Sequence, residues 1–426
     1  MTSTEQMAPP RGGLRGLFRG SAGIAVAMAV MNVATYGFQM LAARILGPTE
    51  YGAVASLMAL LMVLAVLQLG LQATAARRIS STPEHVAQIE RVVLTVTYRA
   101  ALGLGAVMLL AAPVVQVLLK LDTVWPAVFL ALAAVPLTVQ GGQAGILQGE
   151  RRWLPLALVY LGVGVPRLVI CSLCVWVRPT EASAMFGVML GLLVPALVGW
   201  LALRRPRERG AQSAEHAGPA IVRETFHASL ALLAFFVLSN ADIVVARNVL
   251  DAHDAGLYAG GLILTKAALF LPQFVVVVAF PAMSTVEARR RALLRSLGLV
   301  AVLGACCALG VLLLPDVAML FVGGREYAEV ESLLWVFAVL GTLLSMLQLL
   351  VYSVLGRQGT RSAYLIWLAV VALVVGGLFT ASLDGLLATV AGVDLVLFVG
   401  LLALSLWRMN RLAPVGDAAR GPAAQA

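Results

Sequence analysis

Long apolar runs separated by short polar segments constrain the fold of this chain more than any other feature. There are about twelve such runs, each with the roughly 20 residues that a helix needs to cross a hydrocarbon layer about 30 Å thick. The runs are continuous rather than alternating, and lipid offers no partners for open backbone groups, so we expect helices and not a barrel. The predicted spans are residues 21–46, 51–76, 92–119, 123–147, 153–177, 182–203, 225–250, 256–282, 293–314, 330–355, 362–381 and 385–407.

The composition agrees with a chain that is dissolved in lipid. Hydrophobic residues make up 61% of the sequence and charged residues only 12%. Soluble proteins carry roughly twice that share of charged residues. The sequence therefore predicts an all-α integral membrane protein.

Basic residues lie mainly in the loops on one side of the predicted membrane, while the opposite loops hold only Lys120, Arg178 and Arg325. Basic loops stay in the cytoplasm, so we expect both termini to be cytoplasmic. The preference for Arg over Lys, with abundant Ala, Val and Leu, favours a GC-rich bacterial genome and hence the bacterial cytoplasmic (inner) membrane. Because the charges recur at every cytoplasmic turn, the net charge of +9 reports topology and does not predict nucleic-acid binding.

A polar cytoplasmic segment divides the chain into two similar halves. The predicted parts are a basic N-terminal segment (1–20), a six-helix lobe (21–203), a linker (204–224), a second six-helix lobe (225–407) and a cytoplasmic tail (408–426). The end of the first span and the end of the seventh share a pattern of Arg, a short turn, and Gly at the start of the next helix. We therefore predict a parallel internal repeat, with the turn residues Arg44, Gly47, Gly52, Arg247, Gly256 and Tyr258.

These repeat segments also resemble a known family. RILGPTEYG at 44–52 is similar to the first helix and turn of polysaccharide-repeat-unit flippases, and the segment from Ser239 to Ser284 looks like the seventh and eighth helices of the same family. The resemblance implies the fold of the MATE-like multidrug/oligosaccharidyl-lipid/polysaccharide exporter superfamily. It also implies transport of a lipid-linked oligosaccharide or polysaccharide unit by alternating access. The implied partners are a lipid-linked glycan with an anionic head group, membrane lipids and glycan-assembly enzymes.

A few charges lie inside the predicted spans, where each costs about 2.5–3.5 kcal/mol. A functional interpretation makes the cations a site for an anionic head group, because guanidinium groups match phosphate geometry. The structural interpretation is internal ion pairing, for example between Asp242 and Lys266. We expect Arg167 and Lys266 to line one water-filled cavity, whereas Arg44 and Arg247 lie near the outer interface and can snorkel. The cavity candidates are Arg99, Arg167, Lys266, Asp242 and Asp394.

No catalytic, cofactor or metal site is predicted. The four His residues are scattered, the Cys pairs lie inside apolar spans without other ligands, and no phosphate-binding glycine loop is present. A multidrug or metabolite cation antiporter of the MATE type stays open as an alternative, although it would need an intramembrane acid in the first lobe, where we find none. A membrane polymerase or glycosyltransferase would need a large outer loop, and the outer loops are short. A scaffold role has no specific support.

Overall fold

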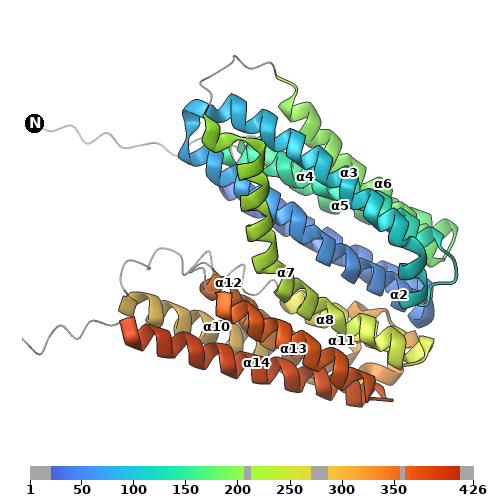
Figure 1. The fold of residues 1–426 in the computed structure, drawn as a ribbon. Coiled ribbons are helices and arrows are strands. Elements are labelled where there is room, and N and C mark those ends of the chain that lie inside the picture. Colours follow the sequence, from blue (N-terminus) through green and yellow to red (C-terminus); the bar gives the residue numbers. More distant parts are fainter. Residues whose placement is uncertain (1–20, 206–212, 270–285, 356–359, 413–426) are drawn as a thin grey trace, which may run out of the picture. The chain divides into compact units, whose positions relative to one another are not determined.

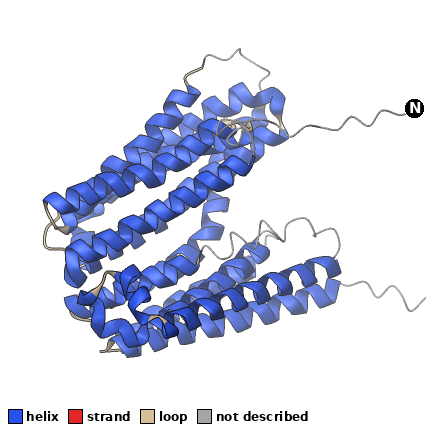
Figure 2. Cartoon of the chain, turned by 180° about the vertical axis from the view of Figure 1, so that it is seen from behind, coloured by secondary structure: helices blue, strands red, loops and turns tan. Residues whose placement is uncertain are grey.

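A computed structural model describes residues 21–205, 213–269, 286–355 and 360–412, and every regular element in these ranges is a helix (Figures 1 and 2). The described chain packs as two compact units. Unit 1 holds the described residues up to Ile45, then Leu64–Val117 and Leu121–Leu230. Unit 2 holds Leu46–Val63, Leu118–Lys120 and the described residues from Ala231 onward.

Unit 1 is built around helix α4 (Trp125–Gly149), of which most residues are buried. A Cβ added at Gly141 or Gly145 would lie 2.5 Å from the backbone oxygens of Gln68 and Gln72, so α4 packs backbone to backbone on α2. Small residues four apart allow this close approach between membrane helices. The other elements of unit 1 are parts of α2 (Ser21–Ser81) and α7 (Gly218–Val249), with α3 (Val86–Leu118), α5 (Trp153–Val177), α6 (Glu181–Leu203), η1 (Pro83–His85) and η2 (Ala214–His216).

Unit 2 contains most of the second half of the chain. The later part of α7 and α8 (Ala252–Ala268) form a hairpin. In it, the Asp251 side chain caps α8 by accepting a hydrogen bond from the backbone nitrogen of Asp254 (2.8 Å). The remaining elements are the Leu46–Val63 part of α2, α10 (Val286–Leu313), α11 (Pro315–Val322), η4 (Arg325–Leu333), α12 (Leu334–Leu355), α13 (Thr360–Leu378) and α14 (Leu383–Leu412).

Helix α2 contains the two predicted spans 21–46 and 51–76, and between them only one residue, Gly47, leaves the helical conformation. Gly47 has φ 70° and ψ 174°, a left-handed conformation that glycine adopts without steric cost, and Pro48 follows it. The two repeat turns contact each other within unit 2. A Cβ on Gly256 would overlap the Pro48 carbonyl, and one on Gly52 would lie 3.0 Å from the Gly256 Cα. Glycines are therefore required where these turns meet.

The predicted fold class is confirmed. Nine stretches of the described chain are long and apolar enough to cross a membrane, and one of them is α2, with its two predicted spans. Helix α5 coincides with the predicted span 153–177. Helix α8 is described only to Ala268, so the rest of the predicted span 256–282 lies outside the described residues apart from the turn residue Leu269.

The division into units differs from the predicted lobes in three places. Leu46–Val63 and Leu118–Lys120, assigned by sequence to the first lobe, pack with unit 2, and α7 joins unit 1 as far as Leu230. The physical reason is that the breaks at Leu46, Leu64, Leu118 and Ala231 fall inside continuous helices, which leave no composition signal. Residues 1–20, part of the linker (206–212) and the tail from 413 lie outside the described residues.

Candidate functional site

Arg167 is the most unusual charged side chain of unit 1. It lies near the middle of α5, is 5% exposed, and its Nε has no hydrogen-bond partner among the described residues. Helix α6 packs closely on α5 at this position, because a Cβ added at Gly191 of α6 would lie 3.0 Å from the Arg167 Cα. Buried polar groups are normally hydrogen-bonded, and a buried guanidinium without an acid is costly. Arg167 therefore has a donor, its Nε, that no described residue of the chain satisfies.

A polar cluster lies between Arg167 and the start of α5. Tyr160 is seven residues earlier on α5, which places it on the same helix face about 10 Å away. The Gln72 amide of α2 donates hydrogen bonds to the Tyr160 hydroxyl (3.0 Å) and to Oε1 of Gln148 on α4 (2.9 Å). Three helices of unit 1 thus contribute uncharged hydrogen-bonding groups on the side of the buried cation that is nearer the start of α5.

Unit 2 contains a separate charged cluster formed by the α7–α8 hairpin. Lys266 of α8 donates hydrogen bonds to the Ser239 carbonyl and to Oδ1 of Asn240 (3.1 Å) on α7. On the same hairpin, Asp242 accepts hydrogen bonds from the Ile243 backbone nitrogen (2.9 Å) and, at its other oxygen, from the Tyr258 hydroxyl (3.3 Å). The α7 residues lie in Leu232–Val249, a stretch long and apolar enough to cross a membrane, while Tyr258 and Lys266 lie in the described part of the predicted span 256–282.

A second buried acid, Asp394 of α14, completes this cluster. Asp394 and Asp242 are 3% and 4% exposed, and both interact electrostatically with Lys266. No direct ion pair joins Lys266 to either acid in the described chain, and Oδ1 of Asp394 is buried without a hydrogen-bond partner there. With both carboxylates ionised, two negative charges face one positive charge. The cluster would then carry a net negative charge, which an additional cation or a proton would neutralise.

The other predicted site residues lie apart from these two places. Arg99 is exposed on α3, away from that helix's buried face. Arg44 is also exposed, whereas Arg247 is buried and donates hydrogen bonds to the carbonyls of Leu119 (3.1 Å) and Lys120 (2.8 Å). Arg247 therefore does not snorkel as predicted, because the turn after α3 supplies acceptors for its guanidinium.

The shared cavity predicted for Arg167 and Lys266 stays a prediction, since the first residue belongs to unit 1 and the second to unit 2. Sequence reasoning assigned Tyr258 only to the repeat turn and missed its bond to Asp242. Their positions in the sequence could have predicted this contact, since Asp242 and Tyr258 are separated from the turn at Asp251 by similar numbers of residues. Residues equally far from a hairpin turn lie beside each other on the two helices.

A polar cluster at the end of α2 holds the start of α7 against α2 and α3 in unit 1. The Arg78 guanidinium pairs with the Glu224 carboxylate (2.7 Å) and contacts Nδ1 of His216 (3.0 Å). Gln88 and the Ser213 backbone exchange two hydrogen bonds, of 2.8 and 2.7 Å. Burial of His216, followed by the charge of Arg78, lowers the pKa of its imidazole below 6.5. Neutral His216 is thus part of the packed arrangement.

No group of three or more His, Cys, Asp or Glu side chains in the described ranges is placed to hold a metal ion.

Solved structures with the same fold are transporters and a flippase. An inward-facing multidrug resistance MATE family transporter of the MOP superfamily is 16% identical, with 91% of this chain and 96% of that chain covered and a TM-score of 0.71. The lipid II flippase MurJ, in an inward closed conformation, is 11% identical, covers 90% and 87% of the two chains, and has a TM-score of 0.68. A MOP superfamily transporter from Pyrococcus furiosus is 16% identical over 94% and 96%, with a TM-score of 0.63.

These likenesses establish a MATE-like fold over most of the chain. Among curated proteins, none matches the sequence. A family match covers residues 17–287, which is more than half of the chain and includes α2 to α8. The predicted resemblance to polysaccharide exporters is confirmed, and the chain belongs to the polysaccharide biosynthesis protein family.

Proposed function

We propose that this protein moves a lipid-linked oligosaccharide, or a polysaccharide unit, across the bacterial cytoplasmic membrane by alternating access. The observation that carries the proposal is Arg167, a buried guanidinium in the middle of a membrane helix without an acidic partner among the described residues. The family match and the fold shared with a lipid II flippase support the same class of substrate.

The chemistry of such a substrate suits the polar groups of unit 1. A lipid-linked glycan carries phosphate next to sugar, and a guanidinium binds phosphate with two parallel hydrogen bonds. Sugar hydroxyls both donate and accept hydrogen bonds, as do Tyr160, Gln72 and Gln148 on the cytoplasmic side of Arg167. An anionic head group would therefore offset the cost of burying Arg167.

The orientation of the chain follows from its charges. We place both termini in the cytoplasm, so that the Tyr160 cluster lies nearer the cytoplasm and Arg167 deeper in the membrane. A substrate assembled in the cytoplasm would then meet the uncharged groups before the cation. Glycan-assembly enzymes on both sides of the membrane are the expected partners.

Transport by reconstituted protein tests the proposal. Proteoliposomes that contain a fluorescent lipid-linked oligosaccharide would report its accessibility on each leaflet. Arg167→Ala should abolish movement of the lipid while leaving protein in the membrane. Arg167→Lys should retain part of the activity, because a point charge replaces a planar fork. The matched control is Arg99→Ala, since Arg99 is another arginine of a predicted span but is exposed.

Equal transport by wild type and a well-folded Arg167→Ala variant would contradict the assignment of Arg167. Loss of folded protein in Arg167→Ala, with normal transport by Arg167→Lys, would instead make Arg167 a structural residue.

A MATE-type antiporter for organic cations is the second candidate, and the buried acids of unit 2 favour it. An organic cation could bind Asp394, whose Oδ1 has no partner in the described structure, and displace a proton. In this case proteoliposomes should take up a cationic dye in response to a pH gradient, and Asp394→Asn should prevent it. Under the leading proposal the same acids would instead couple glycan transport to an ion gradient, and no cationic dye would move.

A further inference from the structure

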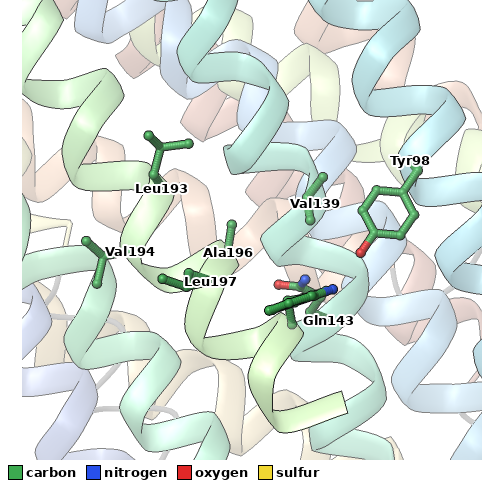
Figure 3. Close-up of a pocket in the computed structure, with 8 residues that line it drawn as sticks. Tyr98, Val139, Gln143, Leu193, Val194, Ala196 and Leu197 are labelled. Atoms are coloured by element: carbon green, nitrogen blue, oxygen red, sulfur yellow. The ribbon is translucent and has the colours of Figure 1, made fainter. Parts of the chain in front are cut away.

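A groove on unit 1 lies outside both of the sites described above. Its floor is α4, with Val139 and Gln143, and its sides are Tyr98 of α3 and the α6 residues Leu193, Leu197 and Trp200 (Figure 3). The volume of about 650 Å³ is within the range of roughly 300–1,000 Å³ of small-molecule sites. The polar groups of its lining residues are the Tyr98 hydroxyl, the Gln143 amide and the Trp200 indole nitrogen, and the other lining side chains are apolar.

The side of the groove on α6 is open and apolar. Leu197 is 54% exposed and Trp200 43%, and Leu193 lies one turn before Leu197 on the same face. A water-filled path through a membrane would be lined by polar groups, whereas exposed leucines of a membrane-spanning helix contact lipid chains. The groove is therefore a recess in a lipid-facing surface.

Cations stand at the cytoplasmic end of both walls. Arg204 follows Trp200 by four residues and stacks on its indole ring, with the guanidinium carbon 4.3 Å from the ring centroid. On the opposite wall, Arg91 precedes Tyr98 by seven residues, so the two share a face of α3, and both are exposed. Arginine and tryptophan at a helix end are typical of the layer where lipid head groups lie.

The floor of the groove contains a polar group that the described protein does not satisfy. Gln143 is 1% exposed and its Oε1 has no hydrogen-bond partner among the described residues. It lies six residues before Gly149, or about 9 Å from the cytoplasmic end of α4. The head-group layer is roughly 5–8 Å thick on each side. Gln143 is therefore at the depth of the glycerol and ester groups of a phospholipid.

We propose that this groove binds an anionic glycerophospholipid of the cytoplasmic leaflet. The phosphate lies near Arg204 and Arg91, an ester carbonyl accepts a hydrogen bond from the Gln143 amide nitrogen, and one acyl chain follows Leu193 and Leu197 toward the membrane centre. An isoprenyl phosphate has no ester carbonyl, so it would leave the Gln143 amide nitrogen against hydrocarbon, which is unfavourable. The site is thus distinct from Arg167, and the proposal does not depend on which substrate is transported.

Lipid retention by the purified full-length protein tests this site. Native mass spectrometry would compare dioleoyl phosphatidylglycerol with dioleoyl phosphatidylcholine, which has the same chains and esters but no net charge. We expect the anionic lipid to bind preferentially to wild type. Arg204→Ala should weaken its binding about fivefold, because a cation near an anionic lipid contributes about 1 kcal/mol. Arg223→Ala, which removes an exposed cytoplasmic arginine outside the groove, is the control.

Two further variants separate the groove from general surface charge. Ala196→Trp should fill the recess and abolish preferential retention while all arginines stay in place, and Gln143→Leu should weaken binding of the ester lipid. Undecaprenyl phosphate serves as the competitor. Equal retention of the two phospholipids, unchanged retention in a folded Ala196→Trp variant, or displacement of phosphatidylglycerol by stoichiometric undecaprenyl phosphate would each overturn the proposal.

Discussion

Removal of the Lys266 ammonium is the sharpest test of how the charged cluster of unit 2 is held together. Lys266→Met keeps most of the side-chain volume but deletes the cation that faces Asp242 and Asp394. Breaking a buried charge cluster by removing one partner costs about 3–5 kcal/mol. The Ser239 carbonyl and the Asn240 amide lose their donor as well. We therefore expect a loss of unfolding free energy near 3–5 kcal/mol.

A double-mutant cycle with Asp394→Asn makes this expectation specific. Asp242 keeps its two donors in the Lys266→Met variant, whereas Asp394 has an oxygen without a partner in the described structure. Asp394→Asn should therefore recover part of the loss, with an interaction energy of about 1.5–3 kcal/mol. Unfolding in detergent micelles, followed by the fraction of monodisperse protein after heating, would measure the order of the four variants.

The chain offers a matched control in Lys120, which is exposed and donates a hydrogen bond to the Asn248 carbonyl (3.2 Å). Lys120→Met should cost less than about 1 kcal/mol. If Lys266→Met were as stable as Lys120→Met, or if the losses from Lys266→Met and Asp394→Asn simply added, the charges would not stabilise one another. A stable Lys266→Met protein without transport would assign Lys266 to the substrate.

Three other perturbations have clear expected outcomes. Gly256→Ala should destabilise the protein by about 1–3 kcal/mol, because the new methyl group would overlap the Pro48 backbone. Gly298→Ala is the control, since Gly298 has open space around it, and its stability in the same thermal assay should be unchanged or slightly higher. The pKa of His216 is lowered in the folded protein, so the stabilisation from neutral His216 is complete above pH 6.5 and is lost as the pH falls through the folded-state pKa. His216→Gln should remove this pH dependence, which proteolysis of the linker at pH 5 to 8 would measure. A reporter fused to the C-terminus should score cytoplasmic, and a periplasmic result would contradict the predicted topology.

The apolar runs predicted the helices well because one physical demand, the crossing of the hydrocarbon layer, acts on each span independently. Helix α5 therefore begins at Trp153 and ends at Val177 as its apolar run does. The predicted break after the first span is also present, but only Gly47 leaves the helical conformation. Membrane spans are predicted from the length and composition of apolar runs, and these do not distinguish a loop between two helices from a single non-helical residue within one helix.

The sites were harder to predict because they depend on which helix faces match. Sequence identified Arg167, Lys266, Asp242 and Asp394 as costly charges, but it could not show that three of them form one cluster. The phospholipid groove was not predicted at all. Gln143 and Trp200 are ordinary residues for a membrane helix until the packing of α4 on α6 places them together.

Helices α2 and α7 each contribute residues to both units, which affects what happens when the chain is cut between them. Helix α2 gives Leu46–Val63 to unit 2, and α7 gives residues as far as Leu230 to unit 1. A cut within 206–212 would therefore produce two fragments, neither of which contains all the helices of a unit. Each fragment would complete the core of the other, as in an exchange of segments between two chains. Fragments expressed together should assemble, while either one alone should be degraded.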